Sequence, residues 1–200
     1  MVQIVTDSSV LYTEEEAKAA GFDVVPLCVS VGDMDGRDLQ INMEEFYGRI
    51  GKGEIPRSSQ PPIGDVVEVY EKYQDADVLN ICVADGLSGT YHGALSARDM
   101  VENRDRITVF NSRTLCGPHR YMVEKAQKMK EEGKGIPEIL EWLKSAAEKT
   151  ESFLIPQDFG FLKRGGRLTP VAAALGSVLK LKHQIMIIRT RFQSGTASDF

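Results

Sequence analysis

The sequence predicts an α/β protein built on a mainly parallel sheet with helices on both faces. Apolar runs of strand length alternate with amphipathic segments of helix length through most of the chain. Residues 78–84 are apolar except for Asn80, a run that is typical of a strand buried on both faces of a parallel sheet. Turn and capping residues separate the runs at a spacing that suits β-α-β crossovers, which place parallel strands in one sheet.

The individual elements follow from these runs and from the residues that start and stop helices. Thr13, with Glu16 three residues later, has the spacing of a capping box, and Gly21 stops that helix. Asn42 and Glu45 repeat the spacing before a second helix. Helices after the first are predicted over residues 43–50, 63–73, 88–103, 118–132 and 137–150. Strands are predicted over residues 2–6, 22–31, 78–84, 107–110 and 153–155, with a proline interrupting the second.

The pattern changes after about residue 157. It becomes a short helix, a Gly-Gly turn, a helix of small residues over 171–181 and a strand over 184–189. The remaining residues are polar and show no periodicity. We therefore expect an N-terminal α/β domain over residues 1–157 and the start of a second α/β domain over residues 158–200, truncated and ending in an atypical tail.

Composition excludes several functional classes. The 200 residues are 42% hydrophobic and 26% charged, which is ordinary for a globular domain. A net charge of -5 and scattered basic residues argue against a nucleic-acid surface. The three cysteines lack the spacing of a zinc site, so we expect no metal. The chain opens on a strand-like segment and has no run long enough to span a bilayer, so we expect a cytoplasmic protein without stable membrane insertion.

The strongest candidate for a binding site is Ser88-Gly89-Thr90, which follows the buried strand and opens a predicted helix. A helix N-terminus presents free backbone N–H groups to an anion, and open α/β sheets bind ligands at the carboxyl ends of their strands. The motif therefore favours a carboxylate or phosphate. The alternative interpretation is that Ser88 only caps the helix, because serine is a common N-cap.

Two further segments offer donors to an anion. Ser58 and Ser59 precede a proline-led helix, and Arg167 follows a Gly-Gly pair that allows close backbone approach to a ligand. The alternatives are a plain helix cap for the serines and a basic surface turn for the arginine. The hydroxyl-rich turn at residues 7–9 is better interpreted as a turn with local side-chain-to-backbone bonds.

No set of residues forms a catalytic constellation. Residues 86–89 miss the G-x-S-x-G pattern by one position, and the three histidines share no spacing typical of a metal site or a proton relay. Phosphate-binding loops of the G-x-x-x-x-G-K-[ST] type are absent from the sequence. We therefore expect a protein that is not an enzyme on its own.

Five motifs in order resemble those of the DegV family. Residues 5–9, 25–27 and 58–61 resemble its V-T-D-S, V-P-L and T-S-Q-P segments, residues 87–91 match L-S-G-T-Y, and residues 162–168 match L-x-R-G-G-R-[IL]. The resemblance runs from residue 2 to about residue 187, with Ser58 where the family usually has threonine. Because family members continue into a complete second domain, the resemblance also implies that this chain is truncated.

The resemblance implies a two-domain α/β protein that holds a long-chain fatty acid and presents its carboxylate to a separate fatty acid kinase, without a cofactor. It implies a binding site for the carboxylate at Ser58, Ser59, Ser88, Gly89, Thr90 and Arg167. Two other functions remain open at this point. One is a phosphotransfer enzyme subunit related to dihydroxyacetone kinases, and the other is an interaction module with a vestigial site.

Overall fold

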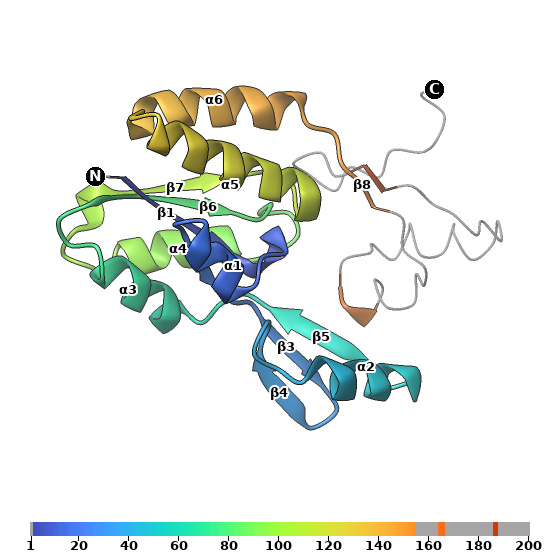
Figure 1. Ribbon diagram of the computed structural model, residues 1–200. Coiled ribbons are helices and arrows are strands. Elements are labelled where there is room, and N and C mark those ends of the chain that lie inside the picture. The colour runs from blue at the N-terminus through green and yellow to red at the C-terminus, as the bar shows by residue number, and fades with distance from the viewer. Residues whose placement is uncertain (1, 155–163, 167–185, 188–200) are drawn as a thin grey trace, which may run out of the picture.

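The predicted α/β class with a parallel sheet is confirmed. The computed structural model describes residues 2–154, 164–166 and 186–187. Its main sheet has the strand order β2-β1-β6-β7, and every neighbouring pair is parallel. Figure 1 shows this sheet at the centre of the molecule. The strands are β1 Val2–Asp7, β2 Asp23–Val25, β6 Asp77–Cys82 and β7 Ile107–Asn111.

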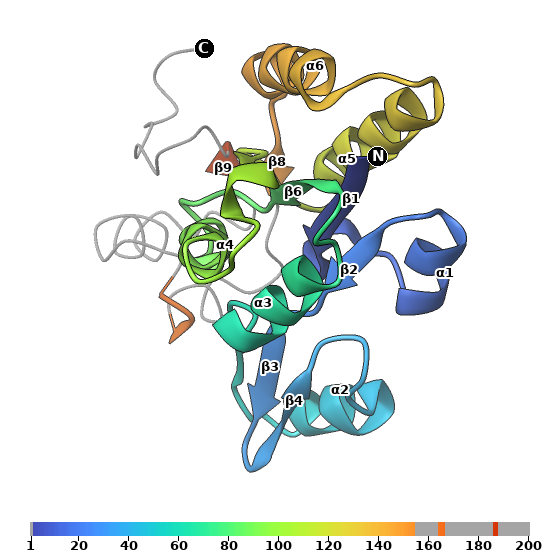
Figure 2. The same ribbon diagram turned by 90° about the vertical axis from the view of Figure 1, so that its left-hand side faces the viewer.

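Helices cover both faces of this sheet, as Figure 2 shows. Because side chains alternate along a strand, Ile4 and Leu79 face one apolar core while Val5 and Val78 face the other. The first core is shared with α1 Glu14–Ala19, α5 Cys116–Glu131 and α6 Ile136–Lys149. The second is shared with α3 Ile63–Glu71 and α4 Thr90–Arg98. Two short 3-10 helices, η1 Ser8–Val10 and η2 Arg104–Arg106, complete the connections.

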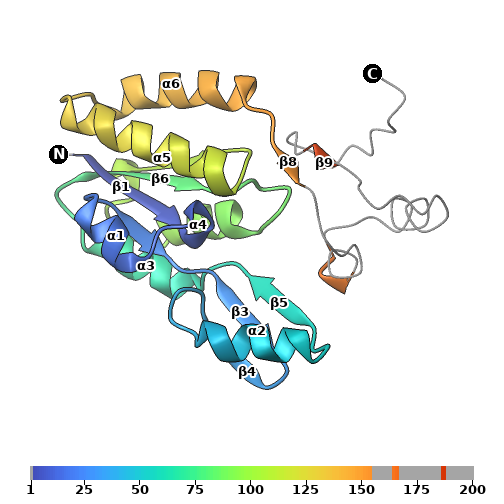
Figure 3. The same ribbon diagram turned by 45° about the vertical axis from the view of Figure 1, so that its right-hand side comes forward.

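A second, antiparallel sheet with the order β4-β3-β5 projects from the main body (Figure 3). Its strands are β3 Cys28–Val31, β4 Met34–Arg37 and β5 Pro56–Ser59, and α2 Met43–Gly51 packs against it. We call residues 28–59 the small lobe. Arg37 in the lobe donates to Asp65 of α3 at 2.7 and 3.2 Å, and Ser8 donates to Asp38 at 2.7 Å. These contacts tie the small lobe to the main body.

One prediction for the region around this lobe was wrong, and two strands of the lobe were missed. The expected single strand over residues 22–31 is two strands in different sheets, because Pro26 has no N–H to continue the ladder. Strands β4 and β5 were not predicted, because their short sequences are polar and lack the apolar alternation of a half-buried strand.

The predicted helix starts are largely confirmed. Thr13 and Glu16 form the full capping box, and the Asn42 side chain accepts from the backbone N–H of Glu45. The helix predicted over residues 88–103 is shorter, because it begins at Thr90 and ends at Arg98. Residues beyond it turn back toward α3, where the Asn103 carboxamide donates to two backbone carbonyls, those of Tyr70 and Tyr73.

A short antiparallel pair joins distant parts of the chain. Strand β8 Phe153–Leu154 pairs with β9 Met186–Ile187, and both lie inside strands predicted from the sequence. The domain boundary predicted at residues 157/158 and the helices predicted after it lie outside the described residues. No helix within the described ranges is long and apolar enough to cross a membrane.

Candidate functional site

The loop between β6 and α4 brings two hydroxyl groups together at the carboxyl edge of the main sheet. The N–H groups of Leu87 and Ser88 both donate to the carbonyl of Ala84, at 3.0 and 3.2 Å, which closes the loop into a tight turn. The Ser88 and Thr90 hydroxyls lie 2.8 Å apart, and Ser88 Oγ also accepts from the Thr90 N–H at 3.3 Å. The hydrogen bond between these two hydroxyls uses only one of their two protons, so the other hydroxyl can donate to a ligand.

The N-terminus of α4 differs in detail from the sequence prediction. Gly89, and not Ser88, occupies the N-cap position, and the helix makes no side-chain cap bond there. The first turn of α4 also carries no acidic residue. The positive end of the helix dipole and its free N–H groups are therefore not neutralised by a carboxylate of the helix's own first turn, which favours an external anion.

Ser58 and Ser59 lie at the end of strand β5, which excludes the alternative interpretation that they cap a helix. The following helix begins at Ile63, its N-cap is Pro62, and no side chain caps it. The serines stand instead opposite Val29 and Cys28 of β3, because β5 pairs with that strand. Both residues are exposed, and their hydroxyls make no hydrogen bond within the part of the chain that the structure describes. They are available to a ligand.

Gln60 joins the two hydroxyl-bearing segments. It directly follows Ser59, and its side chain lies against the start of α4 so closely that a Cβ at Gly89 would collide with its carboxamide oxygen. A Cβ at Gly93, one helical turn further on, would lie 3.2 Å from its carboxamide nitrogen. The backbone of Gly89 is ordinary, with φ −68°, so glycine is needed there for space and not for conformation.

This contact was missed by sequence reasoning, which named Gly89 but gave Gln60 no role. The available signal was the pair of glycines four residues apart, which places two missing side chains on one face of the helix. Without the tertiary structure, nothing showed what fills that face.

The turn after β1 contains the side-chain-to-backbone bonds that its sequence predicts. The buried Asp7 carboxylate accepts from the N–H groups of Ser9, at 3.0 Å, and Val83, at 2.7 Å. The Ser8 hydroxyl accepts from the Leu27 N–H at 3.1 Å while it donates to Asp38. These bonds hold β1, β6 and the entrance to the small lobe in fixed positions.

Arg167, the expected cation of the site, lies outside the described residues. Immediately before it, residues 165–166 form a turn, and Gly166 has φ +75°, a left-handed conformation that glycine adopts without strain. The predicted Gly-Gly turn is therefore confirmed, while the placement of the arginine stays a prediction.

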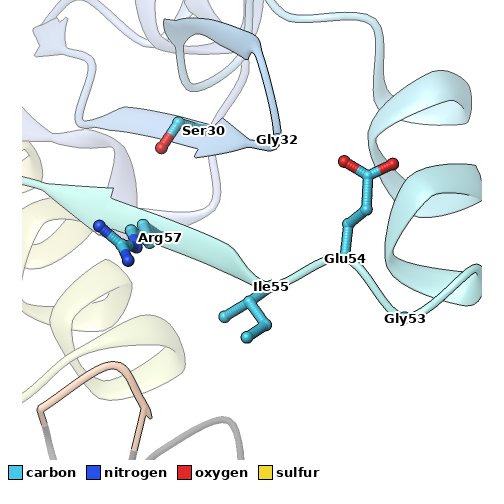
Figure 4. Close-up of a pocket in the computed structure, with 6 residues that line it drawn as sticks. All are labelled: Ser30, Gly32, Gly53, Glu54, Ile55 and Arg57. Atoms are coloured by element: carbon cyan, nitrogen blue, oxygen red, sulfur yellow. The ribbon is translucent and has the colours of Figure 1, made fainter.

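An open hollow occupies the far end of the small lobe and contains none of the predicted site residues (Figure 4). It is lined by Ser30, Gly32, Gly53, Glu54, Ile55 and Arg57. Because its lining is mainly polar and exposed, it lacks the apolar walls typical of a small-molecule pocket. Within residues 2–154, 164–166 and 186–187, no three His, Cys, Asp or Glu side chains come together as a metal site.

Comparison with known proteins identifies the family. The sequence model described as "Uncharacterised protein, DegV family" matches residues 1–191. This chain belongs to the DegV family. It is 33% identical over 187 residues to Protein DegV of Bacillus subtilis and 35% identical over 186 residues to a DegV domain-containing protein of Listeria monocytogenes. Each match covers 90% of this chain and 66% of the relative, so the chain spans just under two thirds of these relatives' length.

Solved structures of the DegV family share the fold. A DegV family protein of Thermus thermophilus, described as binding fatty acid, superposes with a TM-score of 0.82 at 29% identity, covering 94% of this chain and 68% of that one. DegV of Bacillus subtilis, described as a fatty acid binding protein, superposes with a TM-score of 0.81 at 28% identity, covering 98% of this chain and 72% of that one.

Proposed function

We propose that this chain binds a long-chain fatty acid through its carboxylate at the junction of β5, β6 and α4. The observation that carries the proposal is the packing of the Gln60 side chain against Gly89 and Gly93, because Gln60 directly follows the β5 serines in the chain. Both of the DegV structures compared above are described as fatty acid binding, which supports the choice of ligand.

The chemistry of the donors suits a carboxylate. Ser58, Ser59 and one proton of the Ser88–Thr90 pair supply hydroxyl donors, and the start of α4 supplies backbone N–H groups. Such bonds are needed because an unpaired buried carboxylate is very costly, and bonds to a charged acceptor are about twice as strong as neutral ones. Arg167 is proposed to add the positive charge. The acyl chain would contribute about 0.8 kcal/mol for each CH₂ it buries.

The proposed role is that of a carrier and not of an enzyme. In it, the chain holds the acid in the cytoplasm, without a cofactor, and presents the carboxylate to a separate kinase that forms the acyl phosphate. The division into a domain over residues 1–157 and the start of another over 158–200 belongs to the same proposal, with Arg167 on the second part.

Native mass spectrometry of the purified chain, beside a denatured control, tests the ligand. We expect an adduct of fatty-acid mass, already present or formed on adding palmitate, that disappears on denaturation. The double variant Ser88→Ala/Arg167→Ala should lose it. Ser96→Ala is the matched control, because that exposed serine of α4 donates only to the carbonyl of His92. An absent adduct after palmitate addition contradicts the ligand, and an adduct unchanged in the double variant contradicts the site.

A further inference from the structure

A buried histidine lies outside the proposed carboxylate site and is bonded to a serine hydroxyl. His119 of α5 is fully buried under the carboxyl ends of β1 and β6. Its Nε2 lies 3.1 Å from the carbonyl oxygen of Ile81 and 3.2 Å from the Thr6 hydroxyl, and its Nδ1 lies 2.9 Å from the Ser9 hydroxyl. Burial lowers the pKa of His119, so its ring is neutral at neutral pH.

These contacts fix the tautomer of the ring. A carbonyl oxygen can only accept, so the Nε2 atom beside Ile81 must carry the proton. The Thr6 hydroxyl donates its own proton to the same carbonyl at 2.8 Å, so toward His119 it too can only accept. Nδ1 is therefore unprotonated, and the Ser9 hydroxyl donates to it.

This arrangement matches that of an activated nucleophile. A hydroxyl proton directed onto an imidazole nitrogen, with the opposite N–H held by a third group, is the basis of serine nucleophiles, and here the third group is the Ile81 carbonyl. Ser9 is partly exposed, and its N–H is anchored on the Asp7 carboxylate at 3.0 Å. Arg120, next to His119, donates to the carbonyl of Leu11 at 3.1 Å, so a cation lies against the same turn.

We propose that Ser9 is a nucleophile activated by His119, which reacts with activated acyl esters and with their phosphonyl analogues. Its oxygen bonds to the electrophilic carbon or phosphorus while its proton passes to Nδ1 of His119. With a fluorophosphonate, the P–F bond breaks and fluoride leaves with the bonding electrons. With an aryl ester, the C–O bond of the tetrahedral adduct breaks, and the departing phenol oxygen takes the proton back from His119.

The test is labelling of the full chain with a fluorophosphonate probe, followed by peptide mapping. We expect the label on Ser9 and none on Ser8, a serine of the same short helix whose hydroxyl donates to a carboxylate instead. This comparison needs no variant. His119→Asn, checked for folding by circular dichroism, should slow labelling by about a hundredfold or more, the lower end of general-base effects.

Two outcomes would overturn the proposal. Absence of label from Ser9 at saturating probe would mean that the hydroxyl only satisfies a buried ring nitrogen. An unchanged labelling rate in folded His119→Asn would remove the role of the base. Neither outcome depends on fatty acid binding, because the probe reacts at Ser9 and not at the proposed carboxylate site.

Discussion

The contact between Gln60 and Gly89 allows a sharp test of how the proposed site is assembled. In Gly89→Ala, the new Cβ collides with the Gln60 carboxamide oxygen. The φ of −68° at this position suits alanine, and the colliding atom is the end of a flexible side chain, so we expect the fold to survive. The carboxamide must leave its place, and the residue that directly follows the β5 serines loses its contact with α4.

The size of the effect follows from the bonds at stake. Losing one hydrogen bond to a charged acceptor costs about 1.5–3 kcal/mol, and each 1.4 kcal/mol is a tenfold change in affinity. Gly89→Ala should therefore raise the dissociation constant for palmitate by roughly ten- to a hundredfold, measured by displacement of a fluorescent fatty acid. Gly86→Ala is the matched control, because a Cβ in that neighbouring turn position meets no atom within 4 Å.

A double-mutant cycle separates this cause from a general disturbance of the helix. In the Gln60→Ala background the collision is absent, so Gly89→Ala should add almost nothing to the loss of affinity. Interacting residues are expected to be non-additive in this way. If Gly89→Ala weakens palmitate binding by the same factor in both backgrounds, the Gln60 contact does not assemble the site and the reasoning is wrong.

Two further predictions concern stability. Because burial holds the pKa of His119 below its ordinary value near 6.5, the unfolded chain takes up a proton that the folded chain does not, and the free energy of unfolding should fall as the pH drops below about 6.5. Urea titrations between pH 7 and 5 should show a shallower fall in His119→Asn, and equal slopes would contradict this. Thr13→Ala removes the capping box with Glu16 and should cost about 1 kcal/mol, while Thr13→Ser should cost little; equal losses in urea unfolding would refute the cap.

The sequence was sufficient for the parts of the fold that depend on local pattern. The strand β6 and the Thr13 capping box appear in the structure where they were expected. Both can be predicted locally, because a strand buried on both faces needs apolar residues and a helix start needs capping residues. Strand β5 could not be predicted in this way, since its sequence is polar and its pairing with β3 joins residues about thirty positions apart.

The candidate site shows the same division. Ser88 and Thr90 were predicted as site residues from their position after a buried strand, and the structure places their hydroxyls 2.8 Å apart. The serines of β5 were proposed from their place before a helix, whereas the structure places them at the end of a strand, and their role in binding stays a prediction. Gln60 was not assigned a role, since its contact with Gly89 and Gly93 arises only when the small lobe and α4 are brought together in space.

The small lobe enters and leaves the main body through prolines, Pro26 on one side and Pro61 and Pro62 on the other. Proline rings fix φ, so both connections restrict rotation of the lobe against the main body. Ser58 and Ser59 lie at the end of the small lobe nearest the main body, and α2 lies on its outer side. A ligand bound to both the serines and α4 would fix the position of the small lobe relative to α4. By reciprocity, a protein whose binding to α2 shifts the small lobe would change the affinity for that ligand.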